Sequence, residues 1–224
     1  MDSSFCIDCS ALDITAWQAR FDAYMQHHSS DDAAHDIGHF RRVWRNAQTI
    51  MQDEPANELV VLTACYFHDF VNLAKDDPNR HTASLLSGEK TSDILINEFS
   101  DFPKQHIEAV QHAIAAHSFS AKIKPVTIEA KIVQDADRLE ALGPIGLTRV
   151  FYIAGKLGSG MFDSQDPLAK QRELNDHKYG LDHFQIKLLK LPETMQTSKG
   201  RELAEDGAKY LQRFMSDLSN DLKV

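Results

Sequence analysis

Side chains able to bind a divalent metal occur in three separate stretches of this 224-residue chain. His39 lies in AHDIGHFRRV, His68 and Asp69 form a doublet in CYFHDF, and Asp137 lies in QDADRLEALG. Two imidazoles and two carboxylates make a mixed nitrogen and oxygen donor set, which suits an ion that keeps positions open for water and an anionic substrate. The residue types therefore indicate hydrolytic chemistry at a metal.

The elements that carry these residues are predicted to be helices. Apolar positions recur at spacings of three and four, and alternating stretches suited to half-buried strands are absent, so we expect an all-α protein. No repeat, low-complexity tract or linker divides the sequence, which favours a single domain over 1–224. Helices are expected at about 13–28, 36–52, 57–71, 79–99, 103–117, 126–142, 143–157, 181–191 and 198–219.

Two of these helices lead directly to the candidate ligands. The helix over 36–52 has Asp36 as a candidate N-cap and one apolar stripe, formed by Ile37, Phe40, Val43, Ala47 and Ile50. The segment LVVLTACYF is apolar on nearly all sides, so it should run through the centre of the bundle. An unpaired carboxylate at its buried end would cost several kcal/mol, so a cationic partner is expected for Asp69.

The stretch from about 155 to 180 interrupts the helical pattern with Gly155, Gly158, Gly160 and Pro167. This composition predicts a long surface loop, either a lid over the site or a plain flexible insertion. Its GKLGSG segment lacks the G-x-x-x-x-G-K-[ST] spacing of a phosphate loop.

Composition narrows the partners and the compartment. A formal net charge of −9 argues against a broad surface for long nucleic acid. No window holds 18 consecutive apolar residues and no signal peptide opens the chain, so we expect no membrane partner and a cytoplasmic location. Cys6 and Cys9 are interpreted as free thiols, because a structural zinc site needs four ligands. A homodimer is retained as an alternative to a monomer.

The combination of motifs resembles the HD-domain phosphohydrolase superfamily. An isolated His stands about 30 residues before a His-Asp doublet, and an Asp in A-D-R-L follows about 70 residues later. HFRRV is similar to the family's H-x-x-R-V, and the closest likeness is to small stand-alone bacterial HD proteins. The resemblance covers roughly 20–155 and continues more weakly to the C-terminus. It implies an HD-type helical bundle whose metal-site core, about 20–155, is completed by the loop at about 155–180 and the C-terminal helices.

The resemblance implies that His39, His68, Asp69 and Asp137 hold Mn²⁺, Co²⁺, Ni²⁺ or Mg²⁺. His35 lies one turn before His39 and could share a metal with it by spacing alone; the motif match leaves it as a neighbouring or phosphate-facing group. Helical periodicity places Asp135 nearer the apolar face than Asp137, so it remains the alternative fourth ligand.

Further side chains are candidates for contact with a phosphorylated substrate. Asp69 is expected to bind the metal and to orient the attacking water. His112 and His117, in QHAIAAHSF, are candidates for phosphate contact or acid catalysis, and we assign the catalytic role to His117. Arg80, which opens the fourth predicted helix, and Lys187 in HFQIKLLKL are candidates for binding the phosphates. Each has a plain structural alternative as a cap, a core residue or a solvated face.

These features predict a metal-dependent phosphohydrolase acting on a small phosphorylated substrate, with a nucleotide implied by the resemblance. One departure concerns the doublet, which runs on as HDFVNLAKDD, with Asn72 and no acid before Asp76. Some relatives, including (p)ppGpp hydrolases and certain nucleotidases, carry an acidic residue there, so both narrower assignments are weakened. The alternatives are a catalytically weak nucleotide-sensing module and a structural protein that holds a metal for stability.

Overall fold

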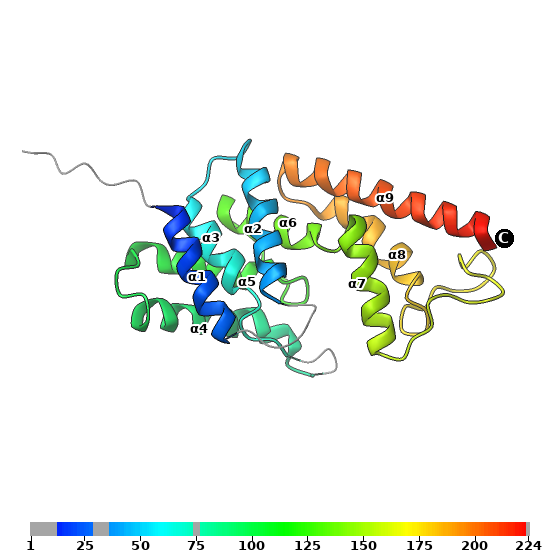
Figure 1. The fold of residues 1–224 in the computed structure, drawn as a ribbon, viewed down its shortest axis with the longest axis horizontal. Coiled ribbons are helices and arrows are strands. Elements are labelled where there is room, and N and C mark those ends of the chain that lie inside the picture. Colours follow the sequence, from blue (N-terminus) through cyan, green and yellow to red (C-terminus); the bar gives the residue numbers. More distant parts are fainter. Residues whose placement is uncertain (1–12, 29–35, 74–76, 223–224) are drawn as a thin grey trace, which may run out of the picture.

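The computed structural model describes residues 13–28, 36–73 and 77–222. Within these ranges the chain is helical and contains no β-strand, only an isolated bridge between Gly160 and Tyr179 (Figure 1). The predicted all-α fold class is confirmed. None of the helices described is both long and apolar enough to cross a membrane. The α-helices are α1 (Ile14–His28), α2 (Ile37–Met51), α3 (Glu58–Phe67), α4 (Ala83–Asn97), α5 (Ile107–His117), α6 (Ile128–Leu139), α7 (Gly143–Lys156), α8 (Asp182–Ile186) and α9 (Ser198–Leu222), and the 3-10 helices are η1 (Arg80–Thr82), η2 (Lys104–His106) and η3 (Leu188–Thr194).

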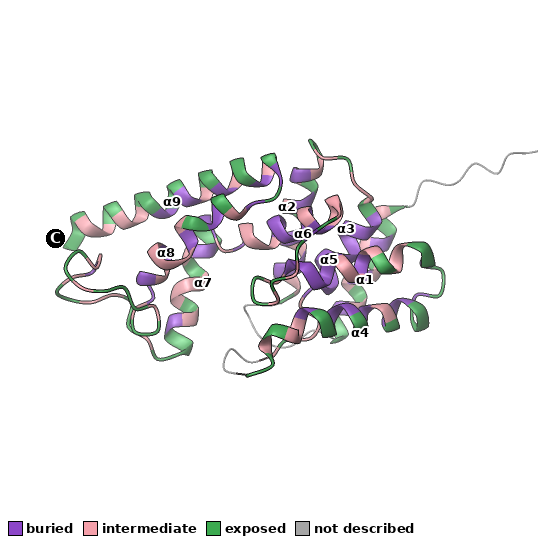
Figure 2. Cartoon of the chain, turned by 180° about the vertical axis from the view of Figure 1, so that it is seen from behind, coloured by how far each residue is buried: buried purple, intermediate pink, exposed green. Residues whose placement is uncertain are grey.

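Helix α3 forms the centre of the first hydrophobic core, as its composition predicts. Every residue from Leu59 to Phe67 is buried, and α1, α2, α5 and α6 pack around it (Figure 2). The helix ends at Phe67, four residues before the predicted end, and His68 is its C-cap. The His-Asp doublet therefore lies at the end of the most buried helix, where its orientation is fixed by the surrounding core.

Side-chain caps begin the helices that carry the other candidate ligands. The Asp36 carboxylate accepts a hydrogen bond from the amide of His39 at 2.9 Å, which confirms the predicted N-cap of α2. Thr127 caps α6 in the same way through the amide of Ala130. Helix α6 packs against both α2 and α5. The start of each helix is thus defined locally, and packing then brings the two helices together.

A second hydrophobic cluster is formed by α7, α8, η3 and α9, with buried Phe184, Leu188 and Leu191 among its members. Leu139 at the end of α6 packs against both clusters. The helix predicted over 181–191 is interrupted: α8 ends at Ile186, and η3 follows with Pro192 inside it. The break lies at Lys187, whose φ of −128° and ψ of −56° are not helical, five residues before Pro192.

The long connection between α7 and α8 is organised by its own acidic side chains. The Asp166 carboxylate accepts hydrogen bonds from the amides of Lys170, Gln171 and Arg172 at 2.7–3.1 Å. Arg172 in turn forms a two-pronged ion pair with Asp182, whose side chain is fully buried at the start of α8. The predicted surface loop is present, and these internal bonds distinguish it from a plain flexible insertion.

Candidate metal centre

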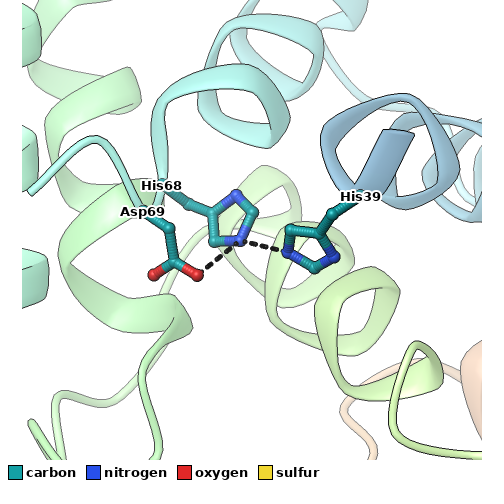
Figure 3. Close-up of side chains that lie close together, drawn as sticks. All are labelled: His39, His68 and Asp69. Atoms are coloured by element: carbon teal, nitrogen blue, oxygen red, sulfur yellow. Dashed lines mark hydrogen bonds and ion pairs between the residues drawn. The ribbon is translucent and has the colours of Figure 1, made fainter. Parts of the chain in front are cut away.

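Four candidate ligands from α2, the end of α3 and α6 lie together, and Figure 3 shows three of them: His39, His68 and Asp69. The Nε2 atoms of His39 and His68 are 3.2 Å apart, and Asp69 Oδ2 lies 3.4 Å from His68 Nε2. Asp137 Oδ1 lies 3.6 Å from His68 Nε2 and 3.7 Å from His39 Nε2. Ligand atoms about 2.1 Å from one ion are about 3.0–3.4 Å apart at octahedral or tetrahedral angles. The separations of His68 from His39 and Asp69 fall within this range and those of Asp137 are 0.2–0.3 Å longer, so a small movement of Asp137 would let the four groups surround a single ion.

Backbone contacts fix the orientation of the His68 imidazole. His68 Nδ1 lies 3.0 Å from the carbonyl oxygen of Cys65, which can only accept, so this nitrogen carries the proton and donates it. Nε2 then faces the other three side chains. Because His68 is completely buried, its ring cannot turn away from them. Metal-ligating histidines are held by their second nitrogen in this way, and His68 can bind an ion through Nε2 when the ion displaces the proton from that atom.

His39 is oriented by Glu140, a residue that the sequence analysis did not identify. His39 Nδ1 lies 3.4 Å from Glu140 Oε2 and 3.2 Å from Nη1 of Arg149. Of these two neighbours only the carboxylate can accept a proton, so Glu140 is the one that suits metal binding through Nε2 of His39. Arg42 holds this carboxylate through its Nε at 2.8 Å. Glu140 could have been found from the sequence by its spacing, because it lies one helical turn after Asp137 and so on the same side of the helix.

The charges of the cluster support one another. Burial opposes the charged form of His68, but the carboxylates of Asp69 and Asp137 outweigh it and raise its pKa to about 10. Burial likewise opposes ionisation of Asp69, and His68 and His117 still hold its pKa well below the usual range. The pKa of Asp137 is lowered in the same way. Both carboxylates are therefore ionised, and the expected cationic partner of Asp69 is supplied by histidine.

His117, at the end of α5, belongs to the same cluster. Its Nδ1 donates to the carbonyl oxygen of Ile114 at 2.6 Å, which directs Nε2 toward Asp69 Oδ1 at 3.4 Å. Its ring meets that of His68 edge-on, with 4.7 Å between the centroids. His68, His117 and Asp137 form a second group whose donor atoms lie within 4.8 Å of one another. The Nε2 atom of His117 is thus placed to bind an ion or to carry a proton at the edge of the cluster.

A small pocket of about 50 Å³ opens beside the cluster. Asp69, His117 and Arg80 line it together with Asn72, Ser118 and Ser120. Arg80 is held there because its Nη1 donates to the carbonyl oxygen of Leu73 at 2.8 Å. A larger hollow is lined only by residues 165–171 and includes none of the candidate ligands. The small pocket therefore combines a cation, hydroxyl groups, His117 and one of the four candidate ligands, Asp69.

Lys187 and His112 have different surroundings. Burial lowers the pKa of Lys187 while the carboxylate of Asp137 opposes this effect, which places the ammonium group close to the cluster. His112 instead accepts a hydrogen bond from the amide of Val126 at 3.1 Å and is not among the pocket-lining side chains. His112 thus has a bracing contact in this structure, and its phosphate contact stays a prediction. His35 lies outside the described residues.

Asp135 and Asp137 point to different parts of the molecule. The buried Asp135 carboxylate accepts hydrogen bonds from the amides of Gln196 and Thr197 and from the Thr197 hydroxyl, all at 2.8–3.0 Å. These donors precede α9, so Asp135 fastens the start of that helix. Helical periodicity identified the more buried carboxylate correctly, but its burial serves packing. Asp137 is the one that contacts the imidazoles.

Comparisons with known proteins agree with this architecture. A family model described as HD domain matches residues 36–142, which include all four candidate ligands. The Bacillus subtilis protein YpgQ is 33% identical over 198 residues, covering 87% of this chain and 87% of YpgQ. The crystal structure of YpgQ in complex with ADP has a TM-score of 0.72 at 29% identity, covering 93% of this chain and 96% of that chain.

An HD-superfamily hydrolase from Bacillus thuringiensis is similar to the same extent. Its crystal structure has a TM-score of 0.71 at 28% identity, covering 94% of this chain and 99% of that chain. The likeness to these proteins extends through the second hydrophobic cluster to the C-terminal helix, beyond the segment that carries the metal-binding motifs. The resemblance seen in the motifs is confirmed, and the chain belongs to the HD-domain phosphohydrolase superfamily.

Proposed function

We propose that this protein is a metal-dependent phosphohydrolase acting on a small phosphorylated substrate, a nucleotide in the first instance. The observation that carries the proposal is the convergence of two imidazoles and two carboxylates beside a pocket that also contains Arg80. His68 Nε2 lies 3.2–3.6 Å from donor atoms of His39, Asp69 and Asp137. A site of mixed nitrogen and oxygen donors with an open side suits hydrolysis better than it suits a closed structural zinc site, which is usually rich in cysteine.

His39, His68, Asp69 and Asp137 would hold the ion. When bound, a divalent ion supplies Lewis acidity and lowers the pKa of coordinated water. Asp69 would also orient the water. Its Oδ2 lies near His68, which leaves Oδ1, on the side of His117 and the pocket, to accept a hydrogen bond from that water. Imidazole ligands favour Mn²⁺, Co²⁺ or Ni²⁺ over Mg²⁺.

His117 is the proposed proton donor to the leaving oxygen. Its Nε2 lies 3.4 Å from Asp69 Oδ1, at the wall of the pocket, and the bond from Nδ1 to the Ile114 carbonyl keeps the ring in this orientation. A positioned imidazole is a common general acid near neutral pH. Arg80 and Lys187 would neutralise the phosphate oxygens, since both are cations close to the cluster.

The choice of a nucleotide is supported by the crystal structure of YpgQ with ADP. Two products are compatible with the proposed roles, because hydrolysis can release phosphate from a monophosphate or pyrophosphate from a triphosphate. The reaction class is the same in both cases, as a water oxygen replaces the leaving oxygen at phosphorus and the leaving oxygen takes a proton.

The test is a panel of nucleoside mono-, di- and triphosphates, assayed with the metal-free protein and with added Mn²⁺, Co²⁺, Ni²⁺ or Mg²⁺. Phosphate and pyrophosphate are quantified separately. We expect metal-dependent turnover that Asp69→Ala reduces at least about 1000-fold and that Asp93→Ala, on the exposed face of α4, leaves unchanged. Absence of turnover with every nucleotide, although the metal binds, would overturn the proposal and favour the nucleotide-sensing module.

A further inference from the structure

Phe119 is an aromatic side chain that the core does not use. It is 60% exposed, and of the phenylalanines within the described ranges it is the only one classed as exposed. It follows α5 in the sequence His117-Ser118-Phe119-Ser120, so its immediate neighbours are polar. A buried or half-buried position would be usual for this residue type. Its exposure is therefore a feature that packing within the described chain does not explain.

The position of Phe119 relates it to the metal centre. His117, two residues earlier and at most about 7 Å away along the chain, contacts Asp69. Ser118 and Ser120, on either side of Phe119, both line the pocket that contains Asp69 and Arg80. The exposed ring is thus carried by the same short turn that forms one wall of the pocket.

Two cations from other elements lie over the Phe119 ring. Nζ of Lys187 is 5.3 Å from the ring centroid, and the guanidinium carbon of Arg138 is 5.9 Å from it. Arg138 directly follows Asp137, and Lys187 is close enough to Asp137 for their charges to interact. An open aromatic ring next to cations and a metal-binding cluster matches the chemistry of a nucleotide, which has a flat base at one end and phosphates at the other.

We propose that Phe119 is the stacking platform for the nucleobase, with Lys187 and Arg138 beside it facing the phosphate end of the same molecule. This inference rests on the proposed nucleotide function and specifies which residue recognises the base. Stacking on a single ring does not read hydrogen-bonding groups, so purine and pyrimidine nucleotides are both accepted, and purines bind more tightly because their ring system is larger.

The experiment compares ADP with pyrophosphate, which has the same linked phosphates and no base. Affinities of both are measured by calorimetry on Mn²⁺-loaded wild-type protein and on Phe119→Ala and Phe119→Trp. Val126→Ala is the matched control, because Val126 is exposed and lies in the same connection between α5 and α6. We expect the Kd of ADP to rise about tenfold in Phe119→Ala and to stay near the wild-type value in Phe119→Trp and Val126→Ala. The Kd of pyrophosphate should not change in any of the three variants.

Two outcomes would overturn the assignment of Phe119. Equal ADP affinity in wild-type and Phe119→Ala would show that the ring does not contact the base. Equal losses for ADP and pyrophosphate would show that the change acts on the phosphate end, for example by releasing Lys187. If wild-type protein hydrolyses nucleotides while either result is found, only this inference fails. If wild-type protein neither binds nor hydrolyses any nucleotide, the proposed function fails with it.

Discussion

Replacing Asp135 and Asp137 one at a time by alanine is expected to have opposite consequences for stability and for metal binding. The two carboxylates are one residue apart on α6, yet Asp135 bonds to the segment before α9 and Asp137 faces His39 and His68. Comparing the two alanine variants therefore tests whether Asp135 stabilises the fold while Asp137 binds the ion.

The stability effect of Asp135→Ala follows from three donors that lose their acceptor. These are the amides of Gln196 and Thr197 and the Thr197 hydroxyl. A hydrogen bond to a charged group contributes about 1.5–3 kcal/mol. Burial raises the pKa of Asp135, which shows that desolvation offsets part of this gain. We expect a net loss of about 3 kcal/mol, which lowers the Tm of a protein of this size by roughly 6–12 °C.

Thermal unfolding with and without Mn²⁺ measures both properties in one assay. At a Mn²⁺ concentration about 100 times Kd, binding stabilises the folded state by about 2.7 kcal/mol. Asp135→Ala should keep this Mn²⁺-dependent rise in Tm although its metal-free Tm is lower. Asp137→Ala should lose most of the rise, because removing a ligand weakens binding at least about 100-fold, more than the 10–100-fold typical of an outer-shell partner.

The reverse pattern would refute this assignment. If Asp135→Ala abolished the Mn²⁺-dependent rise and Asp137→Ala retained it, the fourth ligand would be Asp135 and the hydrogen bonds to Gln196 and Thr197 would have to break on metal binding. Asp135→Asn serves as a second variant, because its amide oxygen still accepts from the segment before α9 and keeps the protein folded.

Three further changes have defined outcomes. Glu140→Gln should weaken Mn²⁺ binding about tenfold, because the neutral amide is a poorer acceptor for His39 Nδ1; titration calorimetry that gave an unchanged Kd would contradict the role of Glu140. Gly200→Ala should destabilise the protein, since the added Cβ would lie 2.5 Å from a carboxylate oxygen of the Asp135 side chain. The same change within a helix usually stabilises by up to about 1 kcal/mol, so a higher free energy of unfolding in chemical denaturation would contradict this prediction. Arg172→Met should cost about 3 kcal/mol by leaving a buried carboxylate at the start of α8 without its cation; urea unfolding checks this, and an equal Mn²⁺ affinity serves as its control.

Local signals were sufficient for the parts of the fold that depend on one helix at a time. The continuous apolar run before His68 predicted a central helix, and every residue of Leu59–Phe67 is buried. Asp36 was recognised as an N-cap from its type and place alone. Both features can be predicted without knowledge of distant residues, because a fully buried helix and an N-cap are recognised from the types of consecutive residues.

The unanticipated features of the site are contacts across long sequence separations. Glu140 bonds to Arg42, 98 residues away, and approaches His39 at a separation of 101 residues. Periodicity places Glu140 on a face of α6 but does not name the helix that meets that face. The same limit applies to His112, whose bond to Val126 depends on the path of the intervening turn. Spacing showed which groups could do chemistry, and packing decided their partners.

Side chains near the candidate metal centre also come from the chain beyond the segment matched by the HD model. That segment ends at residue 142, whereas Arg149, which contacts His39, lies on α7 and Lys187 follows α8. Between the two parts the chain turns at Gly143, whose φ of +62° favours glycine, and the following turn is tight because a Cβ at Gly146 would overlap the backbone of Ala141.

A tight turn that directly follows Glu140 therefore connects the ligand-bearing helices to the second cluster, and α9 also packs against α6 and α2. If Lys187 binds the phosphates as proposed, a cation for the substrate comes from the part of the chain that follows this turn. Chemistry and substrate preference would then be carried by separate parts of one chain, and a family match limited to 36–142 would inform only about the first.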